Sequence, residues 1–155
     1  MKENIKPVGY VEIEIIKADG SKHQEGFNTI SSGIKNKVAD SLRAASTNFG
    51  LLESAFDNDD FSSPPTNESG IYIEDTGSSK YQMKTTLQSS SDLSFVIKGV
   101  ARASQSYTID KAYLGNQYSS GNFTYEYSVY DFNPNVSLSD GDQLNVTWTI
   151  TIADN

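Results

Sequence analysis

The segment from Leu144 to Ile152 constrains the fold more than any other stretch of the chain. Apolar residues occupy every second position of these nine residues, and Asn145 and three threonines stand between them. A period of two is typical of a β-strand with one buried face and one hydrated face. The step Asp140-Gly141-Asp142 just before it predicts a chain reversal. We therefore expect a sheet protein, with Trp148 of the apolar register buried at the centre of its last strand.

Short segments of the same kind recur along the chain. Residues 8–17 alternate apolar residues with glutamates, and after a turn at 18–21 residues 22–27 are expected to return as a hairpin partner. Many short strands without alternating helices predict a mainly β fold, an antiparallel β-sandwich or jelly-roll-like single domain over residues 1–155. Further strands are expected at 71–75, 80–88, 93–103, 107–115 and 122–132, with turns at Gly77-Ser78-Ser79, Ser89-Ser90-Ser91, Gly115-Asn116, Ser119-Ser120-Gly121 and Asn133-Pro134-Asn135.

One helix and one long loop interrupt the predicted strands. Ile34, Val38 and Leu42 recur at helical spacing, so an amphipathic helix is expected at about 32–46, with this stripe lying on a sheet. The stretch DNDDFSSPPTNESG at about 57–70 contains two prolines and many small polar residues, which disfavour helix and strand. A polar loop of this length is often an interaction element. We expect it to contact neighbouring molecules.

Composition and charge argue against several kinds of partner. The chain has 12 basic and 20 acidic residues, a net charge of −8, whereas nucleic acids and anionic membranes are bound mainly through Lys and Arg. No run approaches the ~18 apolar residues of a membrane span. There is no Cys, so neither a disulfide framework nor a thiolate metal site is expected. The opening MKENIKPVGYVEIEI lacks the apolar core of a signal peptide, which predicts a protein made and kept in a cytoplasm, or released by lysis.

No group of residues predicts catalysis or a bound cofactor. His23 is the only histidine, it lies in a polar stretch, and no nucleophile-elbow motif such as G-x-S-x-G accompanies it. The acidic run DNDD at 57–60 offers oxygen ligands for Ca²⁺, but the spacing of an EF-hand loop is missing, which favours a solvated loop over a metal site. We therefore predict a protein that is not an enzyme and that holds no metal or cofactor.

Tyrosines are concentrated in one part of the chain, since six of the nine lie between residues 107 and 130. Tyr is enriched at protein interfaces, and a flat row of exposed rings would also suit stacking on carbohydrate. Where a core is poor in Leu and Ile, the same rings can supply buried area. We expect Phe123 and Tyr125 in the core. At the rim of a surface we expect Tyr113, Tyr118 and Tyr130.

The order of these elements resembles a known class of proteins. The hairpin EIIKADGSKHQEGFNTI leads to the helical segment SSGIKNKVADSL, then to FVIKGVARAS and TIDKAYLGN, and finally to SLSDGDQLNVTWTITI. In this layout the chain resembles the small β-sandwich virion proteins of tailed phages and related viruses, such as head decoration, collar, head-fibre base and tail-tip components. The resemblance covers most of the chain, least so at residues 50–90, and brings no catalytic or ligand motif.

The resemblance implies a structural protein of the virion that self-associates or docks onto other capsid or tail proteins, without catalysis. Its partners are then copies of itself and other virion proteins, and like-charged copies are expected to meet through apolar and hydroxyl-rich surface. A carbohydrate-binding β-sandwich module that uses an aromatic strand face is the alternative. The residues expected at the assembly surface are Tyr113, Tyr118, Tyr130, Asp57, Asp59, Asp60 and Phe61.

Overall fold

The computed structural model describes residues 5–27, 60–61, 70–90, 94–119 and 122–154. The helix expected at about 32–46 and most of the loop expected at about 57–70 lie outside these ranges, so both remain predictions. Within the described ranges the chain forms nine strands: β1 (Ile5–Ile16), β2 (Lys22–Phe27), β3 (Gly70–Asp75), β4 (Lys80–Gln82), β5 (Lys84–Ser90), β6 (Ser94–Arg102), β7 (Tyr107–Ser119), β8 (Asn122–Leu138) and β9 (Gln143–Asp154).

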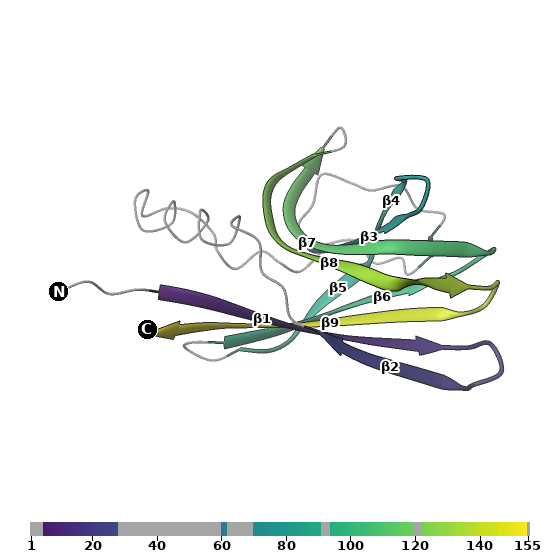
Figure 1. Ribbon diagram of the computed structural model, residues 1–155, viewed down its shortest axis with the longest axis horizontal. Coiled ribbons are helices and arrows are strands. Elements are labelled where there is room, and N and C mark those ends of the chain that lie inside the picture. The colour runs from purple at the N-terminus through teal and green to yellow at the C-terminus, as the bar shows by residue number, and fades with distance from the viewer. Residues whose placement is uncertain (1–4, 28–59, 62–69, 91–93, 120–121, 155) are drawn as a thin grey trace.

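The strands form two sheets, and paired neighbours in both are antiparallel. One sheet has five strands in the order β2-β1-β9-β6-β5, and the other has four in the order β4-β3-β7-β8. In Figure 1, β1, β2 and β9 lie at the lower side of the molecule, and β3, β4 and β7 lie at the upper side. The prediction of a mainly β, antiparallel fold is confirmed for the described part of the chain.

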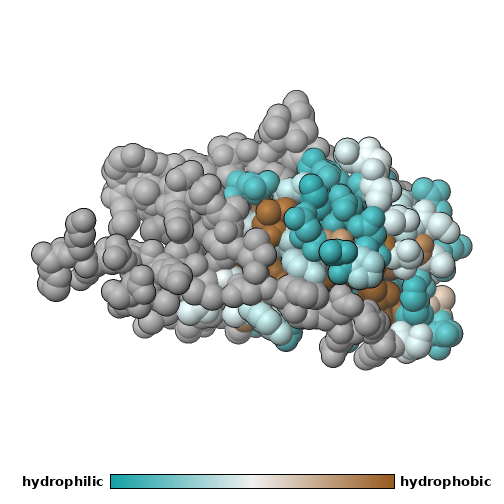
Figure 2. All heavy atoms as spheres, viewed as in Figure 1, coloured by the Kyte–Doolittle hydropathy of each residue, from teal (hydrophilic) through white to brown (hydrophobic). Residues whose placement is uncertain are grey.

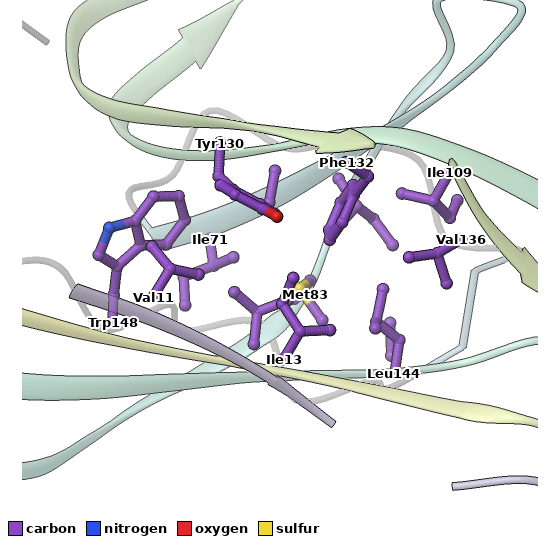
Figure 3. Packing of buried hydrophobic residues seen from close by; sticks show 14 of the residues in the cluster. Val11, Ile13, Ile71, Met83, Ile109, Tyr130, Phe132, Val136, Leu144 and Trp148 are labelled. Atoms are coloured by element: carbon purple, nitrogen blue, oxygen red, sulfur yellow. The ribbon is translucent and has the colours of Figure 1, made fainter. Parts of the chain in front are cut away.

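One hydrophobic core draws residues from both sheets (Figure 3). β1 contributes Val11 and Ile13, and β8 of the other sheet contributes Tyr130 and Phe132. The core residues of β1, β3, β8 and β9 fall at alternate positions, because successive side chains of a strand point to opposite faces. The apolar register predicted for the last strand is fully buried at four described positions: Leu144, Val146, Trp148 and Ile150.

The turns predicted at 18–21 and 140–142 are both confirmed. They lie at the same end of the five-stranded sheet, which we call its turn end. β1 and β2 pair from Val11 and Phe27 to Ile16 and Lys22, as expected for a hairpin. The turn between them places Gly20 at a φ of 89°, and the turn before β9 places Gly141 at a φ of 86°. These are left-handed conformations that glycine adopts without steric cost, so the two turns depend on glycine at these positions.

Trp148 lies in the middle of β9, paired with Val11 of β1 on one side and Ile97 of β6 on the other. Its side chain is fully buried, which confirms the prediction from the apolar register. The indole Nε1–H has no hydrogen-bond acceptor, the one such buried side-chain atom in the described ranges. Trp148 therefore stabilises the fold through its apolar area, and not through its polar group.

The chain changes sheets at Met83, so the prediction of a single strand at 80–88 is wrong. β4 belongs to the four-stranded sheet and β5 to the five-stranded sheet. The Met83 N–H donates to the Ile71 carbonyl at 2.9 Å, and the buried Thr85 hydroxyl donates to the Met83 carbonyl and accepts from the Ile71 N–H, both at 3.0 Å. These bonds satisfy backbone groups that the change of sheet removes from the ladders. A Cβ at Gly99 of β6 would lie 3.0 Å from Met83 and 3.1 Å from Ile71, so this close approach depends on glycine.

Two of the predicted turns are wrong, because the strands continue through them. Gly115-Asn116 lies within β7 and Asn133-Pro134-Asn135 lies within β8, and the register between these two strands shifts beside both. Pro134 has no N–H, and an edge strand such as β8 tolerates this. Register shifts of this kind bend strands, and Figure 1 shows that β7 and β8 curve strongly. The predicted turn at Gly77-Ser78-Ser79 is confirmed between β3 and β4.

Replacing Trp148 with Ala should lower the free energy of unfolding by about 3–5 kcal/mol, because the change removes a large buried ring and leaves a cavity. Trp148→Phe should cost much less, because it keeps most of the ring area and removes the unpaired N–H. Thr149→Ala, on the opposite face of the same strand, should cost at most about 1 kcal/mol. Urea unfolding followed by circular dichroism measures all three. Equal losses for Trp148→Ala and Thr149→Ala would contradict the assignment of the two faces.

Candidate assembly surface

The outer face of the five-stranded sheet is formed by the side chains of β1, β9, β6 and β5 that point away from the core. It carries Tyr10, which is 45% exposed. Among the residues that the structure describes, Tyr10 is the one large hydrophobic residue that is exposed. Half-buried threonines of β9 run along its middle: Thr147, Thr149 and Thr151. In the view of Figure 2, hydrophilic side chains cover most of the described surface, with smaller apolar areas between them. A contact surface on this protein is therefore expected to be mixed, and the outer face has that character.

Strand register arranges the outer face in rows that cross the strands. Glu12 of β1, Thr147 of β9 and Lys98 of β6 stand in one row. The next row consists of Tyr10 of β1, Thr149 of β9 and Val96 of β6. Glu12 and Lys98 are two strand spacings apart, about 10 Å, which is too far for an ion pair. Neither of them forms an ion pair with any residue that the structure describes.

The charges of the outer face are separated by sign. The β1 side carries Glu12 and Glu14, and the side of β6 and β5 carries Lys98, Arg102 and Lys84. The threonines of β9 separate the two groups. Among the described side chains, the face is therefore acidic on one side of β9 and basic on the other, although the whole chain has a net charge of −8.

A line of hydrogen bonds crosses the outer face near its turn end. Arg102 donates to Gln143 Oε1 at 3.2 Å, and Gln143 Nε2 donates to Asn145 Oδ1 at 2.8 Å. Asn145 Nδ2 then donates to Glu14 Oε1 at 3.0 Å. Asn145 is only 3% exposed, although its register predicted a hydrated position. The line fixes polar side chains of three neighbouring strands against the sheet.

Asp142 joins the start of β9 to the neighbouring turns. Its side chain is 3% exposed, and its Oδ2 accepts from Lys17 Nζ at 2.9 Å and from the Ser139 N–H at 2.8 Å. Its Oδ1 accepts from the Ala18 N–H at 3.0 Å, and its backbone carbonyl accepts from the Ala103 N–H at 2.8 Å. One residue therefore holds together the β1–β2 turn, the β8–β9 turn and the segment that follows β6.

These contacts shift the titration of Asp142. Burial alone would raise the pKa of its carboxyl, but the hydrogen bonds from Ser139, Lys17 and Ala18 outweigh burial and leave the pKa below its ordinary value. A carboxyl with a lowered pKa in the folded chain stabilises the fold above its ordinary pKa, and that contribution is lost as the pH falls through the lowered value. The turn end of the five-stranded sheet is therefore expected to be sensitive to acid.

Part of the polar face of the four-stranded sheet is buried. Tyr72 is fully buried, Gln82 is 2% exposed and Glu74 is 7% exposed. Lys80 Nζ lies 2.7 Å from Glu74 Oε2 and 5.5 Å from the centroid of the Tyr113 ring. Burial, followed by the negative charge of Glu74 and other acids, raises the pKa of Tyr113 to about 12. These side chains are not accessible to a partner, whereas the outer face of the five-stranded sheet carries the exposed Tyr10 and Glu12.

Three residues predicted at the assembly surface are buried instead. Tyr130 is 5% exposed and belongs to the core between the sheets. Phe61 is 1% exposed, and its ring centroid lies 4.4 Å from that of Tyr107 and 5.4 Å from that of Tyr81. Tyr113 is 9% exposed beside Lys80. The prediction is wrong for these three, because the rings supply buried area in a chain of which only 36% is hydrophobic.

The other predicted surface residues are described only in part. Asp60 forms an isolated bridge with Arg102 next to the outer face. Tyr118 lies opposite Phe123 in the β7–β8 ladder, and the structure describes its backbone alone. Asp57 and Asp59 lie outside the described ranges, and so do the side chains of Phe123 and Tyr125. A surface role for Asp57, Asp59 and Tyr118 remains a prediction.

The described ranges hold neither a candidate metal cluster nor a membrane-spanning helix. No group of three or more His, Cys, Asp or Glu side chains there could hold a metal ion. The same ranges contain no helix that is long and apolar enough to cross a membrane. His23 lies in the edge strand β2, opposite Ile15.

The sequence analysis missed Tyr10 and Lys98 as surface candidates. Both occupy positions between core residues of their strands, and this alternation is a usable signal. The alternation does not reveal that β1 and β6 both pair with β9. The rows of side chains that cross these three strands could therefore not be predicted from the sequence.

Comparison with protein-family models, with curated proteins and with solved structures finds no match to this chain. Its function is therefore inferred from the geometry of the described residues.

Replacing Asp142 with Asn should lower the free energy of unfolding at neutral pH by about 1.5–3 kcal/mol, because a charged acceptor of three hydrogen bonds is lost. The difference from the wild type should shrink as the pH falls below about 4, since the wild-type carboxyl then becomes protonated as well. Urea unfolding over that pH range measures both effects. Asp140→Asn, in the exposed part of the same turn, is the matched control and should change stability little. A difference that stays constant with pH would contradict the role given to the Asp142 charge.

Proposed function

We propose that this chain is a non-enzymatic structural protein of a virus particle. It would work by associating with copies of itself or by docking onto other capsid or tail proteins, as a decoration, collar, head-fibre or tail component. The observation that carries the proposal is the outer face of the five-stranded sheet, which combines an exposed Tyr10, a line of threonines and separated charges. The order of elements, which resembles that of β-sandwich virion proteins, supports the choice of a virus particle as the place of assembly.

The chemistry of the outer face is that of a protein contact. Interfaces between separately folded proteins are about as polar as the rest of a protein surface, with Tyr enriched at their centre. Tyr10 is flanked across β9 by Val96, which is half-buried, and the threonines between them can both pack and form hydrogen bonds. The face is also supported from beneath by the fully buried Trp148 and Ile150, so it is backed by the core.

A carbohydrate-binding module is the alternative, and it would need a flat row of exposed aromatic rings. In the described chain Tyr10 is exposed, whereas Tyr72, Tyr113 and Tyr130 are buried. A single exposed ring does not form such a row. The described aromatic residues therefore do not supply such a row.

Thr149→Arg should weaken self-association, because it places a long charged side chain at the centre of the outer face. We expect the dissociation constant to rise on the order of tenfold, equivalent to about 1.4 kcal/mol. Thr108→Arg, at an exposed position of the other sheet, is the matched control and should leave association unchanged. Sedimentation equilibrium measures both variants, with circular dichroism to confirm that they fold. An equal loss in the two variants would contradict the choice of face.

The proposed location in a virus particle can be tested directly. Virus particles purified from lysed producer cells should contain the chain in fixed proportion to their major proteins, as measured by quantitative mass spectrometry. Absence from the particles, together with a monomeric state at about 100 μM, would overturn the proposal. Binding of oligosaccharide by that monomer would support the alternative.

A further inference from the structure

We propose that two copies of this chain associate face to face through the outer face of the five-stranded sheet, about a twofold axis that runs parallel to β9. This inference rests on the proposed function and specifies the contact by which the chain associates with itself. The occupant of the face is a second copy of the chain, and the arrangement follows from strand order, register and charge.

Strand order centres the contact on β9. β9 is the middle strand of the five, with β1 and β2 on one side and β6 and β5 on the other. An axis above the middle strand gives the largest overlap of two identical faces. With strands about 4.8 Å apart and about 3.4 Å per residue, the face measures roughly 20 by 30 Å. Full contact would bury roughly 1,200 Å² in total, which exceeds the ~1,000 Å² expected for a stable interface.

Charge selects the direction of the axis. A twofold axis parallel to β9 exchanges the two sides of the sheet and keeps each row at its own level. Glu12 of one copy then faces Lys98 of the second copy, because the two residues share one row on opposite sides of Thr147. The symmetry repeats this opposition, so the contact contains two such pairs. Both residues lack an ion pair within the described part of the chain, and the second copy supplies one.

The other in-plane axis brings together groups of like charge. A twofold axis perpendicular to the strands leaves β1 above β1 and β6 above β6. The acidic side with Glu12 and Glu14 would then face itself, and so would the basic side with Lys98 and Arg102. Like charges placed opposite each other disfavour an interface. The separation of charge by sign therefore discriminates between the two arrangements.

The uncharged residues agree with the axis parallel to β9. Thr147 and Thr149 lie below the axis, so each faces its own copy, and two hydroxyl groups can exchange hydrogen bonds. Tyr10 of one copy lies above Val96 of the second copy, because these two residues share the row of Thr149. This opposes an aromatic ring to a half-buried apolar side chain. A net charge of −8 on each copy is tolerated because the contact itself pairs opposite charges.

Single cysteines test the axis directly, because the chain contains no Cys of its own. Thr147→Cys and Thr149→Cys should each give a covalent dimer with a short bis-maleimide, since both lie on the axis. Thr86→Cys is the matched control: Thr86 is exposed and stands in the row of Thr147, but two strands away on β5. If the axis runs parallel to β9, the two introduced cysteines of the dimer lie far apart, and no cross-link should form. About an axis running along that row, Thr86→Cys would cross-link as well as Thr147→Cys.

Charge exchange gives a second, independent measurement. Glu12→Lys and Lys98→Glu should each raise the dissociation constant of the dimer by about tenfold or more, because each puts like charges opposite each other at two places. The double variant should return to within about threefold of the wild type, because it restores both pairs with their signs exchanged. The replaced side chains are exposed at Glu12 and half-buried at Lys98, so the variants are expected to fold, and circular dichroism checks this.

The outcomes separate this inference from the proposed function. Cross-linking at Thr147 and Thr149 but not at Thr86, with recovery in the double variant, supports the twofold axis. A dimer that cross-links at Thr86, or that shows no recovery, overturns the axis and leaves self-association standing. A wild-type chain that remains monomeric at about 100 μM overturns the inference. Its presence or absence in purified particles then decides the proposed function separately.

Discussion

The register of β9 between β1 and β6 is the constraint on which the rest of the described structure depends. It places Trp148 between Val11 and Ile97 in the core, and in the same step it places Thr147 between Glu12 and Lys98 on the outer face. A shift by one residue would move every side chain of the strand to the opposite face. The buried ring therefore fixes the surface pattern as well as the core. The Asp142 carboxylate adds to this constraint, because it ties the start of β9 to both adjacent turns.

The line of hydrogen bonds from Arg102 to Glu14 has a consequence for association. Its members are already held against the sheet by bonds of 2.8–3.2 Å within β9 and between β9 and its two neighbours. Side chains that are fixed before contact lose little conformational freedom on binding, which is one of the main costs of forming an interface. A face of this kind can bind with modest apolar area, and the described surface offers only modest apolar area.

The sequence predicted those parts of the fold that local patterns determine. The period of two in β9 and the first hairpin, together with the turn at Gly141, were predicted correctly because alternation and turn chemistry act over a few residues. The exchange of sheets at Met83 was missed because nothing in residues 80–88 records which sheet each half joins. Gly115 and Pro134 were assigned to turns, whereas long-range pairing carries the strands through both. The aromatic residues at 61, 113 and 130 were placed at a surface because composition does not say which face a strand turns to the core. The candidate surface was missed for a related reason, since its rows join strands that are far apart in the sequence.

The edge of the four-stranded sheet limits how copies of this chain can add to one another. β8 is the outermost strand there, it carries a proline, and its register with β7 breaks at two places. An incoming strand would meet an irregular row of donors and acceptors, so this edge resists the open-ended pairing that builds fibres. The twofold contact proposed between sheet faces closes on itself, because it occupies the same surface in both copies. In that proposed arrangement, association stops at a pair of copies.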